Sequence, residues 1–237
     1  MDATQLLSGI KTFCETNANA ANVKKYSRFF KDEYIAYGLT QPQMRTWVKD
    51  TLKDKGVTIE TVEETTPLLF ASGKYEEITI ALLLLEGSHK SFTRPTFLFV
   101  ENLFAMGINN WAHADTLGMS IVPRFLKKEI IAIEDLRPWL TATNKFQRRT
   151  VPVSLIKLLG DIEDVGILFG FIEPLMHDPA REVHQGVGWF LRESWKKRPA
   201  ETERFLARWR NTAPRLIIQY ACEKMAPDLR ARFKKSK

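Results

Sequence analysis

The sequence predicts an all-α protein in which antiparallel helix pairs are stacked side by side. Apolar residues recur at helical spacing in about a dozen segments, whereas the alternating pattern of a half-buried strand is almost absent. The breaks between these segments are short and carry Gly, Pro, Asn or Ser, which indicates tight connections between neighbouring helices. Such stacking gives an α-solenoid with a long concave face. No identity repeat is visible, so an irregular helical bundle stays open.

The first half of the chain predicts six helices. Thr40 and Pro42 mark the capped start of the third. Three glutamates occupy the early turns of the fourth, where the helix dipole favours acidic side chains. The expected ranges are 5–15, 21–32, 41–55, 58–71, 74–86 and 95–106.

The second half begins with a longer helix, Trp111–Lys127, capped by Asn109 or Asn110. Pro123 should kink this helix, because proline lacks the backbone N–H that an uninterrupted helix requires. The other expected helices are 134–142, 145–159, 165–176, 178–199, 202–210 and 214–224, followed by a basic tail at 230–237.

Composition predicts a single globular domain over residues 1–237 and excludes a disordered chain, since 44% of the residues are hydrophobic and 27% are charged. Cys14 and Cys222 lack the spacing of a zinc site or a disulfide framework, so we expect two core residues in a reducing cytoplasm. The longest apolar run, 78–85, is too short to span a bilayer. We therefore expect a cytoplasmic protein without a membrane segment.

Charge is distributed unevenly along the chain. Residues 1–118 contain 12 Lys and Arg against 14 Asp and Glu, a balance of −2, whereas residues 119–237 contain 23 against 14, a balance of +9. This asymmetry indicates a polyanionic partner, and nucleic acid fits better than a membrane because the basic residues are spread over many helices. A basic surface that is merely solvated is the alternative.

The helix expected at 178–199 has a tryptophan on its polar side. Its core-facing stripe consists of Val183, Val187, Phe190 and Leu191. Trp189 lies on another arc, together with Arg181, Gln185, Arg192 and Lys196. An indole among such side chains is suited to stacking on nucleic acid, and Gly186 and Gly188 leave room for a close approach of this partner. The alternative is that Trp189 packs against a neighbouring helix.

Metal and nucleotide chemistry find little support in the sequence. The four histidines lack ligand spacing, and no Gly-rich phosphate loop or known hydrolase signature is present, so we expect no metal and no cofactor. Trp111 and Asp115 stand four residues apart and share one side of a helix. Taken alone, this pair is most often a core tryptophan and a surface acid.

Five segments together resemble the AlkD family of alkylpurine DNA glycosylases, in the same order and at comparable spacing. They are RFFK at 28–31, GLTQPQMR at 38–45, NWAHAD at 110–115, NKFQRR at 144–149 and GWFLRE at 188–193. The resemblance covers about residues 25–225. It implies a solenoid of HEAT-like repeats with a concave basic face for double-stranded DNA. It also implies cofactor-independent hydrolysis of the N-glycosidic bond of N3- and N7-alkylated purines, and one such face suits a monomer.

By this resemblance, Asp115, Trp111 and Trp189 form the catalytic cluster around the lesion's deoxyribose, and Arg149 matches an arginine that contacts the DNA backbone. Further DNA contacts are expected from Phe29, Arg45, Arg148, Arg192 and Lys196. Two positions depart from the family pattern: Phe29 replaces a tyrosine, so its hydroxyl is lost, and Arg148 replaces a neutral residue.

The expected chemistry needs a carboxylate and no proton donor. An N3- or N7-alkylated purine is already cationic and therefore a good leaving group, so stabilisation of the oxocarbenium-like sugar remains as the catalytic task. Indole faces add cation–π attraction of roughly 0.5–2 kcal/mol each. The sequence shows no pocket for an extruded base. The alternative function is a non-catalytic helical-repeat protein that binds damaged or branched DNA, or else a protein-binding scaffold.

Overall fold

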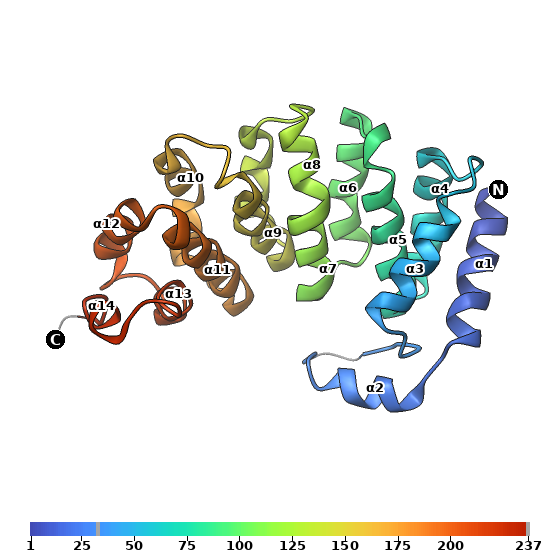
Figure 1. Ribbon diagram of the computed structural model, residues 1–237, viewed down its shortest axis with the longest axis horizontal. Helices are drawn as coiled ribbons and strands as arrows, with labels where there is room; N and C mark the ends of the chain where they lie inside the picture. Colours follow the sequence, from blue (N-terminus) through green and yellow to red (C-terminus); the bar gives the residue numbers. More distant parts are fainter. Residues whose placement is uncertain (32–33, 236–237) are drawn as a thin grey trace. The chain divides into compact units, whose positions relative to one another are not determined.

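The computed structural model describes residues 1–31 and 34–235, and within these ranges it contains helices, turns and loops but no strand (Figure 1). The fold class expected from the sequence is therefore confirmed as all-α. The α-helices are α1 (Ala3–Thr16), α2 (Ala20–Ser27), α3 (Gln41–Thr51), α4 (Ile59–Ala71), α5 (Tyr75–Gly87), α6 (Arg94–Met106), α7 (Trp111–Thr116), α8 (Val122–Lys127), α9 (Lys145–Leu155), α10 (Val165–Ile172), α11 (Arg181–Lys197), α12 (Pro199–Trp209), α13 (Arg215–Ala221) and α14 (Pro227–Ala231).

The chain forms two compact units, Met1–His113 and Ala114–Lys237, which are described separately. In the first unit α5 is the central helix: α1, α3 and α4 all pack against it. Its apolar run at 78–85 is buried on every side, which explains why this segment shows no polar face. The short helix α2 lies crosswise to α1 and α3 (Figure 1).

A buried carboxylate fixes the loop between α2 and α3. Glu76, on α5, accepts backbone N–H groups from Tyr37 at 2.8 Å, Gly38 at 2.7 Å and Leu39 at 3.1 Å. Gly38 has φ +91°, a conformation that L side chains rarely adopt. Because a charged acceptor strengthens each hydrogen bond, Glu76 holds residues 37–39 against α5 and so fixes the entry into α3.

The second unit is centred on α9 and α11. Helix α11 packs against α9, α12 and α13, and its predicted core stripe, Val183, Val187, Phe190 and Leu191, is fully buried. Burial of this stripe confirms the helical phase assigned to 178–199, and with it the position of Trp189 outside the apolar face. Asp178 precedes the helix, and its carboxylate accepts the N–H of Ala180 at 2.8 Å.

Several α-helices are shorter than predicted, because part of the expected segment forms 3₁₀- or π-helical turns. The segment 111–127 is interrupted by a π-helical turn at Leu117–Ile121, after which α8 begins at Val122 with Pro123 in its first turn. The kink expected at Pro123 stays a prediction. The segment expected at 134–142 is a 3₁₀ helix, Ile133–Thr141, and 3₁₀ turns also extend α9 and α10. The expected helix 21–32 ends at Ser27, and Asp32 lies outside the described residues.

Two glycines of α11 serve helix packing within the protein. A Cβ on Gly186 would lie 3.1 Å from Cγ of Arg149 on α9, and a Cβ on Gly188 would lie 2.4 Å from Cβ of Tyr220 on α13. The expectation that these glycines make room for a partner beside Trp189 is therefore wrong. They allow two neighbouring helices to approach α11 closely.

Both cysteines are buried core residues, as expected. Burial is the main cause that raises the pKa of the Cys14 thiol to about 12 and that of Cys222 to about 11. Among the described residues, no helix is long and apolar enough to cross a membrane.

Gly188→Ala should destabilise the second unit, because the added methyl group collides with the side chain of Tyr220 and lies 3.0 Å from the carbonyl oxygen of Ile217. We expect a loss of about 1–3 kcal/mol in the free energy of unfolding, measured by urea denaturation. Gly170→Ala is the matched control, since it also replaces a helical glycine but its Cβ meets nothing within 4 Å. The packing argument is contradicted if Gly188→Ala is no less stable than Gly170→Ala.

Candidate functional site: a buried carboxylate and an aromatic cluster

Asp115 forms a two-pronged ion pair with Arg149 inside the second unit. Nε of Arg149 donates to Oδ1 and Nη2 donates to Oδ2, both at 2.8 Å. Only 16% of the Asp115 side chain and 7% of the Arg149 side chain are exposed, so water screens this pair weakly. The carboxylate is thereby held in one orientation by α9.

Two opposing effects act on the Asp115 carboxyl. Burial raises its pKa, and the hydrogen bonds and positive charge of Arg149 lower it. Burial is the larger effect, so the pKa lies above the usual value for an aspartate. The group is thus a desolvated carboxylate whose charge depends on its arginine partner, a combination typical of functional sites.

Arg149 is itself positioned by α11. Its Nη1 donates to the carbonyl oxygen of Glu182 at 2.7 Å, and the contact of Gly186 with α9 brings the two helices close enough for this bond. Three of the five guanidinium N–H groups therefore have protein partners, and two remain that could reach a phosphate. The match of Arg149 to a backbone-contacting arginine stays a prediction.

Arg148 is fastened inside the second unit. It donates from Nε and Nη2 to the buried carboxylate of Asp178, at 2.6 and 3.1 Å, and from Nη1 to the carbonyl oxygens of Ala142 and Thr143. These contacts tie the start of α9 to the loop that precedes α11. Only one N–H group of Arg148 remains for the predicted DNA contact.

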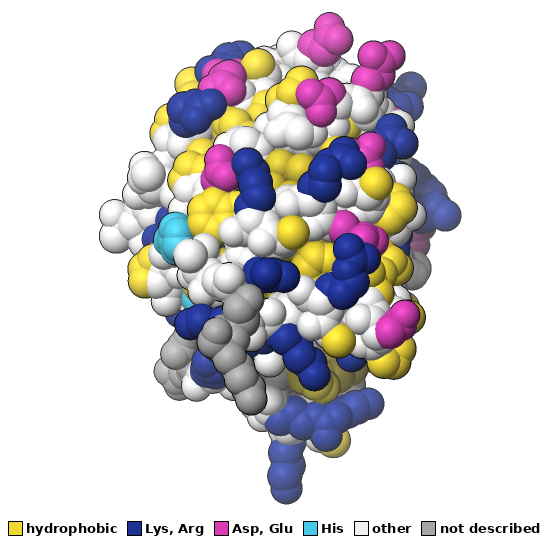
Figure 2. Space-filling model, turned by 90° about the vertical axis from the view of Figure 1, so that its left-hand side faces the viewer, with side chains coloured by type: hydrophobic (Ala, Val, Ile, Leu, Met, Phe, Trp, Pro, Cys, Tyr) yellow, Lys and Arg dark blue, Asp and Glu magenta, His cyan; other side chains and the backbone are white. Residues whose placement is uncertain are grey.

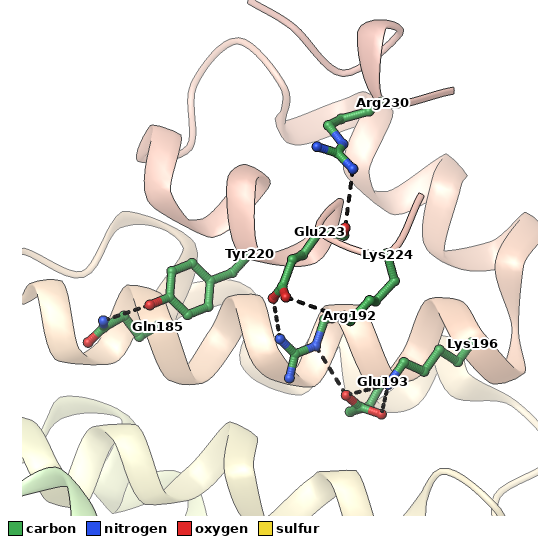
Figure 3. A network of polar contacts seen from close by, with 8 residues as sticks. All are labelled: Gln185, Arg192, Glu193, Lys196, Tyr220, Glu223, Lys224 and Arg230. Atoms are coloured by element: carbon green, nitrogen blue, oxygen red, sulfur yellow. Dashed lines mark hydrogen bonds and ion pairs between the residues drawn. The ribbon is translucent and has the colours of Figure 1, made fainter. Parts of the chain in front are cut away.

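Several side chains on the polar side of α11 are partly buried or bonded to other residues of the protein. Trp189 is half-buried, and Gln185 donates to the hydroxyl of Tyr220 at 2.9 Å. Arg192 lies between two acids: its Nε donates to Glu193 at 3.1 Å and its Nη1 to Glu223 (Figure 3). Two of the side chains expected to face DNA therefore have partners within the protein.

The two remaining predicted cations are exposed. Lys196 pairs with Glu193 at 2.8 Å on the surface of α11, and Arg45 approaches Glu86 at 3.4 Å in the first unit. Surface pairs of this kind exchange readily for another anion, because they contribute at most about 1 kcal/mol. On the face drawn in Figure 2, Lys and Arg side chains lie among Asp and Glu in the upper part, whereas the lower part carries Lys and Arg side chains with almost no acid between them.

Trp111 belongs to an aromatic cluster of the first unit. Its ring stacks on Phe30, with centroids 6.0 Å apart, and its indole Nε1 donates to the carbonyl oxygen of Phe29 at 3.3 Å. Trp111 is 42% exposed and Phe29 is 55% exposed, which is unusual for side chains of this size. The expected assembly of Trp111 with Asp115 and Trp189 involves both units and stays a prediction.

His113 anchors the start of α7 beneath this cluster. Its Nε2 lies 3.2 Å from the carbonyl oxygen of Tyr75 and therefore carries the proton, while its Nδ1 accepts from Asn110 at 2.8 Å. Burial lowers the pKa of His113 to about 4, so the ring is neutral at physiological pH. The histidine thus fixes the backbone that carries Trp111.

Comparison with known proteins identifies the family of this chain. The sequence family described as "DNA alkylation repair enzyme" matches residues 10–225 of the chain. This chain belongs to that family. Sequence comparison with curated proteins gives no match. The membership agrees with the resemblance stated from the five segments and establishes a place in the repair of alkylated DNA.

Two solved structures share the fold of this chain. A predicted DNA alkylation repair enzyme from Enterococcus faecalis superposes with a TM-score of 0.76 at 15% identity, covering 89% of this chain and 97% of its own. AlkD2 from Streptococcus mutans gives a TM-score of 0.61 at 19% identity, with coverages of 87% and 98%. At such low identity these matches establish the helical-repeat fold alone.

Sequence reasoning missed three residues of this alkylation repair protein's aromatic cluster: Phe30, Tyr34 and Tyr75. The first two could have been found in the sequence, because four aromatic residues fall between positions 26 and 34. Tyr75 could not, since it lies at the start of α5 and joins the cluster only when the chain folds. No sequence motif predicts that the backbone carbonyl oxygen of Glu182 accepts a bond from Arg149.

Arg149→Ala should destabilise the protein by about 3–5 kcal/mol at pH 7.5, because it leaves the Asp115 carboxylate buried without its partner. Removal of Arg149 raises the pKa of Asp115 further above its unfolded value. An acid shifted upward on folding opposes folding when charged, so the loss should shrink as the pH falls towards 4.5 and Asp115 takes up a proton. Urea denaturation at both pH values measures it.

Asp115→Asn combined with Arg149→Ala is the control for this interpretation. The double variant has no buried charge at the pair, so it should regain part of the lost stability at pH 7.5 and show little pH dependence. A loss of stability in Arg149→Ala that is identical at the two pH values would contradict an unpaired Asp115 charge as its cause.

Proposed function

We propose that this alkylation repair protein is a monofunctional DNA glycosylase that hydrolyses the N-glycosidic bond of cationic N3- and N7-alkylated purines in double-stranded DNA. The observation that carries the proposal is the desolvated Asp115 carboxylate, held in one orientation by both prongs of Arg149. The protein acts without a cofactor, as a monomer, at DNA in the cytoplasm.

The ion pair with Arg149 leaves the Asp115 carboxylate able to accept further hydrogen bonds. Each oxygen of Asp115 accepts one bond from Arg149, and each therefore keeps lone-pair capacity for an attacking water. As the glycosidic bond breaks, positive charge develops on the sugar, and a fixed carboxylate stabilises it without reorganising. Low exposure strengthens this attraction, because the effective dielectric constant is smaller than in water.

The tryptophans and the basic residues are proposed to bind the lesion and the DNA phosphates. Trp111 and Trp189 offer indole faces to the cationic lesion, and the exposure of Trp111 leaves its ring accessible. Arg149, Arg192, Lys196 and Arg45 are the proposed phosphate contacts, and Phe29 adds an exposed ring. The second unit carries 23 Lys and Arg against 15 Asp and Glu, a balance of +8, which attracts a polyanion to the unit that holds Asp115.

One observation favours the second candidate, a non-catalytic protein that binds damaged or branched DNA. A buried pair such as Asp115–Arg149 can stabilise the fold without catalysing a reaction, and the second unit contains another such pair, Arg148–Asp178. Release of a base separates the two candidates, and salt-sensitive DNA binding separates both from a protein-binding scaffold.

Asp115→Asn should slow excision by roughly 10²- to 10³-fold, since it keeps the size of the side chain but removes its charge. The loss should be greater for N7-methylguanine than for N3-methyladenine, whose weaker glycosidic bond demands less from the enzyme. DNA affinity should be equal or higher, because one negative charge near a polyanion is removed. The measurement is single-turnover release of each base from defined duplexes.

Asp178→Asn is the matched control, because it also disrupts a buried arginine–aspartate pair of the second unit but lies outside the proposed catalytic cluster. It should lose stability and keep its excision rate. Wild-type protein that releases neither base, or an Asp115→Asn variant as fast as wild type, would favour the non-catalytic candidate.

Trp189→Ala should reduce excision with a small change in stability, because Trp189 is half-buried and lies off the apolar stripe of α11. Phe190→Ala should instead cost about 3–5 kcal/mol of stability as the truncation of a fully buried ring. Thermal unfolding and single-turnover excision compare the two variants. Equal melting-point losses would show that Trp189 is a packing residue.

A further inference from the structure

The carboxylate of Glu223 lies between two cations on the surface of the second unit (Figure 3). Its Oε2 accepts a hydrogen bond from Nη1 of Arg192 on α11, and its Oε1 lies 3.3 Å from Nζ of Lys224. The hydrogen bond from Arg192 and the one from Lys224 lower the pKa of Glu223, so this group is charged at neutral pH. Each carboxylate oxygen is thus held by a different cation.

The turn that carries Glu223 and Lys224 is fixed in place. Cys222 and Met225, on either side of these two residues, are buried in the core. Arg230 donates from Nη2 to the backbone carbonyl oxygens of Glu223 at 3.2 Å and Met225 at 3.0 Å. The backbone is therefore held from both sides, while the side chains of Glu223 and Lys224 are 47% and 55% exposed.

Glu223 is one of few acids in a strongly basic part of the chain. Residues 210–237 contain eight Lys and Arg against two acids, Glu223 and Asp228. Glu223 nevertheless lies against Arg192, a proposed phosphate contact, whose side chain is only 20% exposed and which also donates to Glu193. Ion pairs at the surface contribute little to stability, because water screens them. A structural role alone therefore explains the position of Glu223 poorly.

We propose that Arg192 and Lys224 form a binding site for one phosphate of DNA, and that Glu223 occupies this site in the free protein. A phosphodiester has two non-bridging oxygens that share one negative charge, as the two oxygens of a carboxylate do. The phosphate would therefore replace the carboxylate, with one oxygen on each cation. The inference rests on the proposed function in taking DNA as the partner and Arg192 as a phosphate contact. It adds Lys224 to the interface and makes Glu223 a competing anion.

The exchange of one anion for another weakens binding to any duplex. A phosphate that binds Arg192 and Lys224 must first displace Glu223, and the displaced carboxylate then lies close to a polyanion. The exchange also releases few counterions, because Glu223 already neutralises these cations in the free protein. Glu223 thus lowers the affinity for undamaged DNA and makes this affinity less sensitive to salt.

Glu223→Gln should raise the affinity for an undamaged duplex by roughly two- to fivefold, the factor that corresponds to the loss of one exposed ion pair. The slope of log affinity against log salt concentration should become steeper by about 0.9, the value for one further phosphate contact. Fluorescence anisotropy of an end-labelled duplex at several salt concentrations measures both quantities.

Asp228→Asn is the matched control for Glu223→Gln. It removes the same charge from the other acid of residues 210–237, which is exposed at the start of α14. Because this change frees neither Arg192 nor Lys224, it should raise the affinity less and leave the slope unchanged. Equal effects of the two variants, or a Glu223→Gln protein with the affinity and slope of the wild type, would overturn the proposal.

A second comparison separates the release of the two cations from a simple loss of repulsion. In protein that carries Arg192→Gln and Lys224→Gln the site no longer exists. Adding Glu223→Gln to this protein should therefore leave the slope unchanged and raise the affinity no more than Asp228→Asn does. A gain as large as in the otherwise wild-type chain would contradict the site, because long-range repulsion would then explain the effect.

The phosphate site and the glycosylase can fail separately, because these measurements use undamaged DNA and require no release of a base. A protein in which Glu223→Gln gives the expected gain, but which releases no alkylated purine, keeps the phosphate site and contradicts the glycosylase. A protein that releases the purine, but in which Glu223→Gln changes nothing, keeps the glycosylase and contradicts the phosphate site.

Discussion

The Asp115–Arg149 pair is the interaction on which the arrangement of the second unit depends. Arg149 lies on α9, is oriented by the bond that it donates to the carbonyl oxygen of Glu182 on α11, and holds the carboxylate of Asp115 on α7. Three helices therefore meet at one guanidinium. A buried charge is tolerated only when its partner is in place, so the pair also requires the close packing of α9 against α11 that Gly186 allows.

A second carboxylate performs a comparable task in the first unit. Glu76 gathers three successive N–H groups of residues 37–39, which places Leu39 and the start of α3 beside the aromatic rings. The neutral His113 on α7 likewise fixes the backbone that carries Trp111, through Asn110 and the carbonyl oxygen of Tyr75. Buried polar groups with complete sets of partners thus position the surface residues that we propose to meet DNA.

The second unit contains two arginine–aspartate pairs, and only one of them belongs to the candidate catalytic site. Arg148 and Arg149 are adjacent in sequence, and both pair with a largely buried aspartate. Arg148 has one N–H group left, whereas Arg149 has two and holds Asp115, the carboxylate that the sequence motif marks. Family membership places the chain among DNA alkylation repair enzymes, and the proposed chemistry assigns the hydrolytic step to Asp115 rather than to Asp178.

The all-α class, the phase of α11 and the buried stripe from Val183 to Leu191 could be predicted from the sequence, because helical periodicity is a local property of the chain. The sequence also marked Trp111, Asp115 and Trp189, through motifs that resemble a known family. The side-chain partners could be read only from the folded chain: Arg149 pairs with Asp115, Arg192 lies between two acids, and two glycines of α11 face Tyr220 and Arg149 rather than a ligand. Apart from Arg192 with its neighbour Glu193, these contacts join residues more than 30 positions apart. Their geometry depends on how closely helices approach, which no local pattern encodes.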